Sequence, residues 1–438
     1  MTRPRPSLAA LALALWASAR LAGQEASAPL DLERALELAA RNNETAGIAA
    51  TRVERAQALR RQAIAALLPS LTVTGTYTRR PREITREVGD ETVTVQARDA
   101  FSSQALAETT LFDLRALPLL RAANRGLEAQ ELESSELRRA LAHDVATGYF
   151  LVLGAEQLLE ASRERVRVAQ VTAEEARLRV EAGLAGRNDA TRSELELANA
   201  RLAETRAAND AVTTRLSLAY LIGEPLEGRA LLEPDHPAAP AGTREELVAR
   251  AQAGRAELVA LAGRAEQARE LARVPRWGIV PRLDARGVYR TTNESGLSGR
   301  EEDWNLAVGL TWELWDGGNR EAVAAQRDAE ARELELQLDQ RRREVALEVS
   351  EVLAALESAE AGVEQASVRR EVATANSNEI RERFQNGLAT ALEQADASVE
   401  QFEAESELVR QRYTRALARL ALIRALGQWP GAQPEGAP

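Results

Sequence analysis

The 438-residue chain lacks cysteine altogether and has only two histidines. Without cysteine, disulfides, thiolate nucleophiles, cysteine-based zinc sites and a lipidated N-terminal cysteine are excluded. His143 falls within a helical pattern, where we expect a packing or helix-surface residue, and His236 falls in a proline-rich loop. The sequence therefore predicts no metal site and no cofactor. Because it also lacks a nucleophile–base or phosphate-binding motif, it predicts no enzyme.

Lysine is also absent, so all 56 basic residues are arginine, and aromatic residues make up only 4% of the chain. Alanine, leucine, glutamate, glutamine and arginine are abundant, and these residues favour long helices. High charge and a mean hydropathy of -0.32 leave no helical stretch apolar enough to cross a bilayer. The net charge of -11 argues against nucleic acid as a partner, because such proteins present clustered basic residues.

The first 23 residues have the pattern of a secretory signal peptide. Two arginines precede an apolar run from Leu8 to Trp16, and small residues follow, with candidate cleavage sites after Ala19 and Gly23. A short membrane anchor is the alternative, but the apolar run is too short to span a bilayer. We therefore predict export, with a mature protein in the periplasm, in the outer membrane or outside the cell.

One turn occurs twice and organises the chain. Arg179–Ala185 and Arg383–Ala389 each end a long helical pattern with Gly-Leu-Ala, and another helix follows within a few residues. Glycine just after a helix adopts the left-handed conformation that other residues resist. Each copy therefore predicts the tip of a helical hairpin, and the recurrence predicts a tandem duplication.

Each half of the chain follows the same order: helix, two strands, a very long helix, the turn and a return helix. In the first half we expect helix over 31–68 with a break at Asn42 and Asn43, strands over 71–78 and 101–111 separated by a charged loop, and helices over 119–180 and 189–222. In the second half we expect helix over 243–274, ended by Pro275, strands over 283–290 and 304–315, and helices over 316–383 and up to 426. The predicted domains are a signal peptide (1–23), a first repeat (24–232), a linker (233–242), a second repeat (243–427) and a disordered tail (428–438).

The four strands alternate apolar and polar residues, which is typical of a sheet with one wet face. The apolar faces have Trp and Tyr toward their ends, as in the aromatic girdles of outer-membrane barrels, but four strands cannot close a barrel. If the strands enter a membrane, several copies of the chain must share one barrel. Its pore would then be lined by Thr72, Thr74, Arg282, Asp284, Arg286 and Glu313. The alternative is a soluble four-stranded sheet that packs its apolar face on helices.

Two motifs in this plan show a family resemblance. Leu314–Arg320, after the last strand, and Arg381–Ala397, around the second turn, resemble the corresponding segments of TolC-like outer-membrane efflux proteins. The resemblance covers about residues 30 to 427 and implies a mainly α-helical homotrimer, with a 12-stranded membrane β-barrel continued by a periplasmic α-helical barrel. It also implies a passive exit duct of a tripartite efflux pump or type I secretion system. The implied partners are outer-membrane lipid, a periplasmic adaptor (a membrane fusion protein) and an inner-membrane transporter of the RND or ABC type.

The resemblance also assigns roles to residues near the two turns. The adaptor is expected to dock at Gly183, Leu184, Ala185, Gly387, Leu388 and Ala389. Glu393 and Asp396 match acidic rings at the periplasmic entrance, which would favour cations; the alternative is that both acids complement the positive N-terminal end of the last helix. Asp189 matches the acid of the family's entrance latch. Phe384 and Ala389 stand at the partner positions, so the latch itself is not implied.

A soluble periplasmic coiled-coil scaffold or adaptor is the alternative function, since adaptors also present helical hairpins. The apolar face between Trp304 and Trp315 argues against it, because an adaptor has no reason to place such a face on a long strand. The sequence does not identify the transported substrate, because specificity in such systems usually lies in the inner-membrane transporter.

Overall fold

The computed structural model describes residues 29–88, 91–226, 228–234, 240–294 and 300–430. The predicted signal peptide and His236 lie outside the described residues, as does most of the predicted disordered tail. The chain divides into two compact units, and each unit takes residues from both predicted repeats. The helical unit contains residues up to 50, from 134 to 256 and from 342 onward, and the sheet unit contains residues 51–133 and 257–341.

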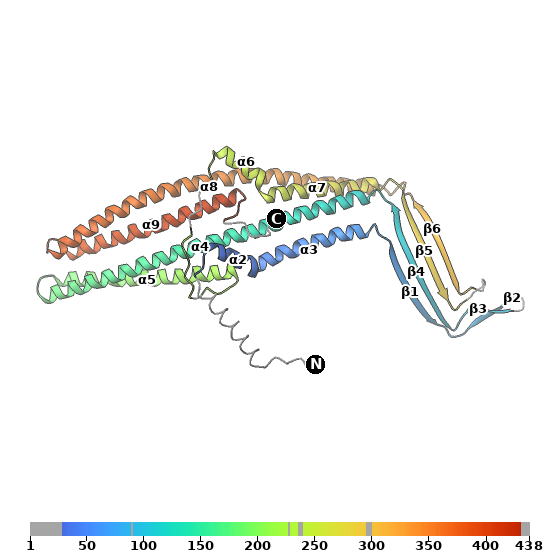
Figure 1. Ribbon diagram of the computed structural model, residues 1–438, viewed down its shortest axis with the longest axis horizontal. Helices are drawn as coiled ribbons and strands as arrows, with labels where there is room; N and C mark the ends of the chain where they lie inside the picture. Colours follow the sequence, from blue (N-terminus) through green and yellow to red (C-terminus); the bar gives the residue numbers. More distant parts are fainter. Residues whose placement is uncertain (1–28, 89–90, 227, 235–239, 295–299, 431–438) are drawn as a thin grey trace, which may run out of the picture. The chain divides into compact units, whose positions relative to one another are not determined.

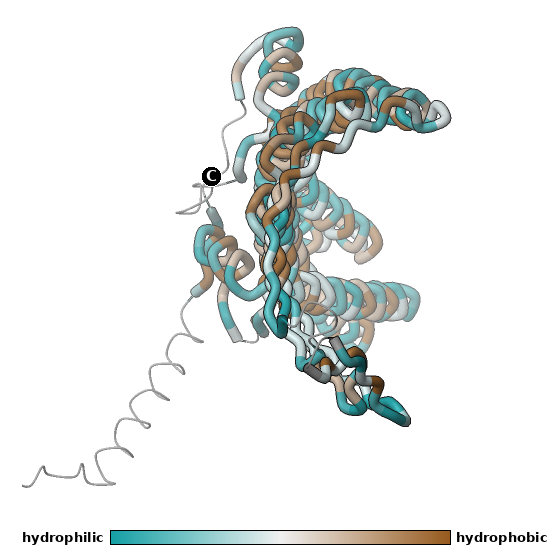
Figure 2. The backbone as a smooth tube through the Cα atoms, turned by 90° about the vertical axis from the view of Figure 1, so that its right-hand side faces the viewer, coloured by the Kyte–Doolittle hydropathy of each residue, from teal (hydrophilic) through white to brown (hydrophobic). Residues whose placement is uncertain are grey.

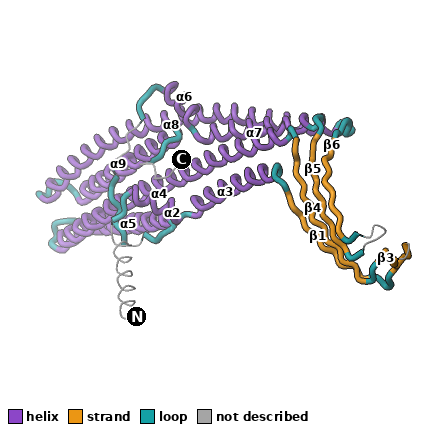
Figure 3. Tube along the Cα trace, turned by 45° about the vertical axis from the view of Figure 1, so that its right-hand side comes forward, coloured by secondary structure: helices purple, strands orange, loops and turns teal. Residues whose placement is uncertain are grey.

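The sheet unit contains four antiparallel strands in the order β1-β4-β5-β6 (Figures 1 and 3). They are β1 (Ser70–Arg79), β4 (Asp99–Phe112), β5 (Arg282–Thr292) and β6 (Glu302–Thr311). Cross-strand pairs such as Val73 with Ala105 and Tyr289 with Trp304 gather apolar side chains on one face. That face stays open: Val73 is 69% exposed and Trp304 is 74% exposed. The predicted alternation is confirmed, and helices of the same chain do not cover the apolar face.

Four helices contribute to the sheet unit, and arginine–carboxylate pairs join them. α3 (Glu44–Ala65) precedes β1, α4 (Ala116–Glu181) follows β4, α7 (Ala256–Trp277) precedes β5 and α8 (Asn319–Gln385) follows β6. Arg264 of α7 donates to Glu133 of α4 at 2.8 Å, and Arg341 of α8 donates to Glu257 of α7 at 3.0 Å. In the part of the chain that the structure describes, no helix combines the length and apolarity needed to span a bilayer, and hydrophilic residues recur along the helices (Figure 2).

The charged segment between the first two predicted strands contains a small second sheet that the sequence analysis missed. It consists of β2 (Ile84–Val88) and β3 (Glu91–Gln96), which pair antiparallel. Glu294 fixes the base of this hairpin, because its carboxylate accepts from the Ala97 N–H at 2.8 Å and pairs with Arg80. The surrounding charges concealed the alternating Thr-Val-Thr-Val of β3, so the prediction of a loop here is wrong.

The last strand ends at Thr311, earlier than predicted. Trp312 lies outside the ladder, and its indole N–H donates to the Ile279 carbonyl at 3.0 Å. Asp316, three residues before α8, caps the start of that helix, since its carboxylate accepts from the Arg320 N–H at 2.8 Å. Glu313 therefore lies two residues past the end of the strand, and its pore-lining role stays a prediction.

Two helix boundaries in the second half also differ from the predictions. Pro275 does not end its helix, because α7 continues to Trp277. A proline this close to the helix end removes an N–H bond only from the last turn. The segment before it is broken at Arg255 into α6 (Arg244–Gly254) and α7. The predicted break at Asn42 and Asn43 in the first half is confirmed, between α2 (Leu32–Asn42) and α3.

The helical unit contains α2, α5 (Arg187–Ile222), α6, α9 (Ala391–Ala425) and parts of α4 and α8. Its largest fully buried side chains include Tyr149 and Phe150 of α4, which pack with Leu218 of α5. The Tyr149 hydroxyl lies 2.7 Å from the Leu30 carbonyl and 2.6 Å from the Leu232 carbonyl. This one side chain therefore ties both the segment before α2 and the end of the predicted first repeat to the long helix.

Three basic side chains bind the carbonyls at the end of α9. Arg255 donates to the Ala425 carbonyl at 2.6 Å, and Arg139 donates to the Gly427 carbonyl. The ring of His143 contacts the Gln428 carbonyl at 2.8 Å through Nε2, which must be the protonated nitrogen because a carbonyl only accepts. These contacts supply donors to carbonyls that a helix end leaves without intrahelical partners. We call this group (Arg139, His143 and Arg255) the C-terminal clamp.

The clamp predicts a pH dependence of stability. Burial lowers the pKa of His143 from its ordinary 6.5 to about 4, despite the hydrogen bond to Gln428, and the charges of Arg424 and Arg139 lower it further. The unfolded chain therefore binds a proton near pH 6.5 that the folded chain takes up only near pH 4. The stability associated with neutral His143 is complete above pH 6.5 and is lost as pH falls from 6.5 toward 4. The loss is about 3 kcal/mol for a shift of this size.

The measurement is the urea midpoint of the detergent-solubilised protein at pH 7 and pH 4.5, for the unsubstituted chain and for His143→Gln. Glutamine keeps an N–H donor for the Gln428 carbonyl but does not titrate. We expect a smaller decrease of the midpoint in His143→Gln. An identical decrease in both proteins would assign the acid sensitivity to carboxylates elsewhere.

Candidate functional site

The two Gly-Leu turns have the same backbone geometry. Gly183 and Gly387 each have φ of 72°, in the left-handed region. Leu184 N–H donates to the Arg179 carbonyl and Leu388 N–H donates to the Arg383 carbonyl, both at 2.8 Å. This pattern closes the last helical turn and requires glycine at the left-handed position. The prediction of two hairpin tips is confirmed, one joining α4 to α5 and the other joining α8 to α9 (Figure 1).

Each tip exposes one leucine. Leu184 is 81% exposed and Leu388 is 70% exposed, while the alanines that follow them are half-buried. Large apolar side chains at the end of a helical hairpin have no structural use in a single chain. The docking role of the six predicted tip residues stays a prediction, and the two exposed leucines are the side chains best placed to serve it.

Two of the three predicted entrance acids cap helices. Asp189 accepts from the Gly186 N–H at 3.2 Å at the start of α5, and Glu393 accepts from the Thr390 N–H at 2.8 Å at the start of α9. Glu393 also accepts from the Thr390 hydroxyl at 2.9 Å. The backbone N–H and then the hydroxyl of Thr390 lower the pKa of Glu393, which keeps it ionised. Both acids occupy the third helical position and accept from the N–H of the N-cap residue, so the duplication extends to this detail. Only the second tip has a complete capping box, because Gly186 has no side chain that could accept from the Asp189 N–H, whereas the Thr390 hydroxyl accepts from the Glu393 N–H.

Asp396 differs from the two capping acids. It is exposed one turn after Glu393, and no hydrogen bond or ion pair joins its carboxylate to another described residue. Gln394, which follows Glu393, and Ala397, which follows Asp396, are buried, so Glu393 and Asp396 share the open face of α9. The structure thus supports the helix-end role for Glu393 and leaves Asp396 without one, and a gate formed by these acids stays a prediction.

Removing the charge of both residues tests the gate. Glu393→Gln with Asp396→Asn keeps a residue type that the capping box accepts and removes two negative charges per chain. In the channel that the family resemblance implies, the cation-to-anion permeability ratio is expected to fall several-fold, measured from reversal potentials under a salt gradient. Glu371→Gln is the control, because it neutralises an exposed acid of α8 that has no predicted role at the entrance. An unchanged ratio in the double variant would leave only the helix-end role.

Phe384 contributes an interaction that the sequence analysis did not find. Its ring is 3% exposed, and the Arg179 guanidinium carbon lies 3.9 Å from the ring centroid. Arg179 also donates to the Phe384 carbonyl at 3.1 Å. Arg179 is in the last turn of α4 and Phe384 in the last turn of α8, so the pair joins the two hairpins just above their tips. Asp189 takes no part in it, because its carboxylate caps α5.

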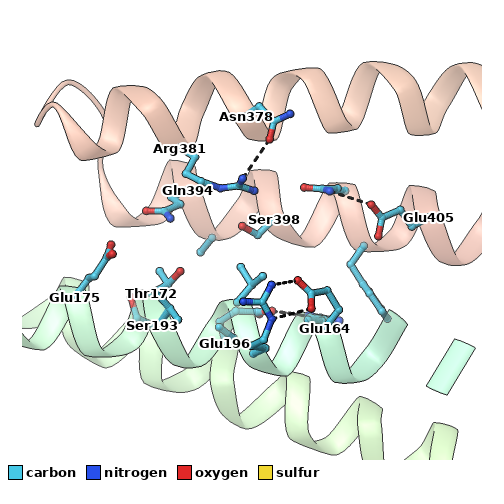
Figure 4. A pocket seen from close by; sticks show the side chains of 18 of the residues that line it. Glu164, Thr172, Glu175, Ser193, Glu196, Asn378, Arg381, Gln394, Ser398 and Glu405 are labelled. Atoms are coloured by element: carbon cyan, nitrogen blue, oxygen red, sulfur yellow. Dashed lines mark hydrogen bonds and ion pairs between the residues drawn. The ribbon is translucent and has the colours of Figure 1, made fainter. Parts of the chain in front are cut away.

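A second arginine–phenylalanine contact joins the same hairpins farther from the tips. The Arg165 guanidinium of α4 lies 4.6 Å from the Phe402 ring centroid of α9 and donates to Glu196 of α5 at 2.6 Å. Between the two contacts lies a cleft of about 490 Å³, with α4 and α5 on one side and α8 and α9 on the other (Figure 4). We call it the inter-hairpin cleft. Sequence reasoning gave no signal for it, because each wall comes from a different half of the chain.

The polar face of the sheet brings together five of the six predicted pore-lining residues. The register pairs Arg286 with Glu108 and Asp284 with Thr110, and it places Thr72 and Thr74 on the same side through β4. Arg286 lies 3.4 Å from Glu108, and Arg282 donates to Asp284 at 2.7 Å. The charges on this face are therefore largely paired with one another. Glu313 lies just past β6, outside the paired register of this face.

Comparison with known proteins gives the family. A sequence model of the outer membrane efflux protein family matches residues 35–224 and 247–428, which is well over half of the chain. The chain therefore belongs to this family, whose members are outer membrane channel proteins. The resemblance stated from the Leu314–Arg320 and Arg381–Ala397 motifs is confirmed.

Individual relatives are similar but distant. Outer membrane protein TolC of Vibrio cholerae is 27% identical over 300 residues, which cover 65% of this chain and 66% of that protein. Among solved structures, VceC of Vibrio cholerae has a TM-score of 0.76 at 20% identity, with 91% of this chain and 96% of that chain covered. CmeC of Campylobacter jejuni has a TM-score of 0.78 at 16% identity, with coverages of 90% and 85%. These likenesses show the fold, and the predicted mainly α-helical class with a duplicated unit and a barrel sheet is confirmed.

Proposed function

We propose that this protein is the outer-membrane exit duct of a tripartite efflux pump or a type I secretion system. In this proposal three copies of the chain form one 12-stranded β-barrel in the outer membrane, and their helices form a periplasmic α-helical barrel. The duct conducts small molecules or exported substrates passively. Family membership supports a channel over the alternative of a soluble periplasmic scaffold or adaptor.

The observation that carries the proposal is the open four-stranded sheet. β1 and β6 are its edge strands, so each has a row of backbone N–H and C=O groups without a partner strand. In a membrane such edges cost several kcal/mol for each unpaired group, and a closed barrel abolishes them. The exposed apolar face suits lipid, and the polar face with its paired charges suits a water-filled lumen. Another copy of the chain paired against each edge strand would satisfy the unpaired backbone groups. It would also keep the apolar face toward lipid and the polar face toward the lumen.

The proposal extends to partners at the other end of the duct. A periplasmic adaptor would dock on the exposed Leu184 and Leu388, and it would link the duct to an inner-membrane transporter of the RND or ABC type. The two exposed leucines support this part of the proposal, because burial on a partner would remove about 2 kcal/mol of unfavourable exposure for each.

The test combines fractionation with electrophysiology. The protein is expected in the outer-membrane fraction, to resist carbonate extraction, and to form conductive pores in planar bilayers after purification as a trimer. A Gly replacement of both Leu184 and Leu388 is expected to abolish complementation of an efflux or secretion defect while leaving the pores intact. A protein that carbonate releases without detergent and that forms no pores would contradict the proposal.

A further inference from the structure

The inter-hairpin cleft has a lining that the proposed duct does not require. Gln394 projects from the start of α9 toward Thr172 and Glu175 of α4 (Figure 4). Gln394 is only 7% exposed, and its side-chain oxygen Oε1 is buried without a hydrogen-bond partner. A buried carbonyl oxygen without a donor costs about as much as a lost hydrogen bond. We propose that the cleft is a binding site for a small organic cation with a primary amino group, held by Gln394 and Glu175.

The charges around the cleft select this class of ligand. Arg165 is paired with Glu196, Arg167 with Glu164, and Glu405 accepts from Gln401. Arg381 donates to Asn378 on its own helix. The carboxylate of Glu175 has no hydrogen bond or ion pair with another described residue.

The cleft therefore offers two acceptors, the Gln394 oxygen and the Glu175 carboxylate, that lack donors. Its seven charged side chains comprise four acids and three arginines, which leaves an excess of one negative charge. An ammonium group provides three N–H donors for the two acceptors and one positive charge to balance the excess negative charge. The net negative charge of the lining would repel an anion. A metal ion is a poor match, because the structure's described residues contain no group of three or more carboxylates or histidines arranged to hold one.

The volume sets the size of the ligand. A cavity of about 490 Å³ is within the range of small-molecule sites, and it is large enough for a diamine or polyamine chain. The site is separate from the open face of α9 that displays Glu393 and Asp396, because Gln394 lies on the buried side of that helix. The inference goes beyond the proposed function and does not depend on it, since binding is measured on the purified protein whether or not it conducts.

The experiment is isothermal titration calorimetry of the purified full-length protein in detergent, with 1,4-diaminobutane as the probe. Tetramethylammonium, which has the charge but no N–H donor, and 1,4-butanediol, which has no charge, are the comparison ligands. We expect saturable binding of the diamine and at least several-fold weaker binding of both comparison ligands. Gln394→Leu and Glu175→Gln are each expected to weaken diamine binding by about tenfold, as for loss of a charged hydrogen bond.

Two variants separate the site from general attraction to an acidic protein. Glu379→Gln removes one negative charge from an exposed position of α8 outside the cleft, so it is expected to leave diamine affinity unchanged. Gln394→Glu keeps the shape of the side chain and adds negative charge, so it is expected to tighten binding several-fold. Helix content by circular dichroism checks that each variant folds.

Three results would overturn the proposal: no saturable diamine binding, equal binding of tetramethylammonium, or equal weakening by Glu379→Gln and Glu175→Gln. Failure of this test leaves pore formation untouched, and absence of pores leaves diamine binding untouched, so the two proposals fail separately.

Discussion

Phe384→Leu is expected to shift the channel toward its open state by about tenfold. Leucine preserves the apolar volume of a side chain that is 3% exposed, but it removes the aromatic face over which the Arg179 guanidinium lies at 3.9 Å. A desolvated cation–π contact of this kind contributes about 1–2 kcal/mol, and 1.4 kcal/mol corresponds to tenfold in an equilibrium constant. The expectation rests on the proposed function, with the added premise that the mouth of the duct widens when the two hairpins of a chain separate.

The reciprocal change, Arg179→Gln, is expected to act in the same direction. It removes both the cation–π contact and the charged hydrogen bond to the Phe384 carbonyl, so its effect should be at least as large. Open probability and conductance of single channels in planar bilayers are the quantities to measure. Arg177→Gln is the matched control, because Arg177 is exposed two residues earlier and its ion-pair partners among the described residues, Glu174 and Glu181, belong to its own helix. Phe384→Leu and Arg179→Gln channels that behave like the unsubstituted protein would show that other contacts hold the mouth closed.

Arg255→Met is expected to lower the free energy of unfolding of the helical unit by about 2–3 kcal/mol, the usual cost of losing hydrogen bonds from a charged group whose partner carboxylate is partly exposed. The Arg255 side chain is only 6% exposed, and it donates to Glu348 at 2.8 Å and to the Ala425 carbonyl at 2.6 Å. Methionine fills much of the same volume but leaves a carboxylate and a helix-end carbonyl without this donor. The end of α9 should therefore detach first.

Urea midpoints in detergent report the global effect, and amide hydrogen exchange along α9 reports the local one. Arg250→Met, at an exposed position of α6, is the control and should change stability by less than about 0.5 kcal/mol. If Arg255→Met and Arg250→Met are equally stable, the contacts of Arg255 do not stabilise the fold. Faster exchange spread evenly over α9 would contradict the expected local release at its end.

Local pattern was sufficient for most of the secondary structure. The alternation of Leu71, Val73 and Tyr77 with threonines predicted β1, because side chains of a strand point alternately to its two faces. The same rule failed beyond Thr311, where alternation continues through Trp312 and Leu314 but the strand does not. Alternation records which side chains are apolar, whereas the end of a strand depends on whether a partner backbone is present. Here the Trp312 indole binds the Ile279 carbonyl instead of joining the sheet.

The candidate site was predictable only in its local parts. The two glycines near the tips marked the turns, because the left-handed conformation is a property of one residue and its neighbours. Glu393 was recognised as an acid near a helix start, and whether it caps or gates could not be decided without the position of Thr390. The Arg179–Phe384 contact joins residues 205 positions apart, and no pattern along the chain brings such residues together.

The sequence by itself determined the duplicated order of elements, the two hairpin tips and the apolar and polar faces of the strands. Each of these depends on residues within a few positions of one another. Only the tertiary structure decided which arginines contact the phenylalanines of the other hairpin and where the inter-hairpin cleft lies. Those features form where helices from the two halves of the chain pack side by side. Their geometry depends on long-range packing, which local sequence preferences do not determine.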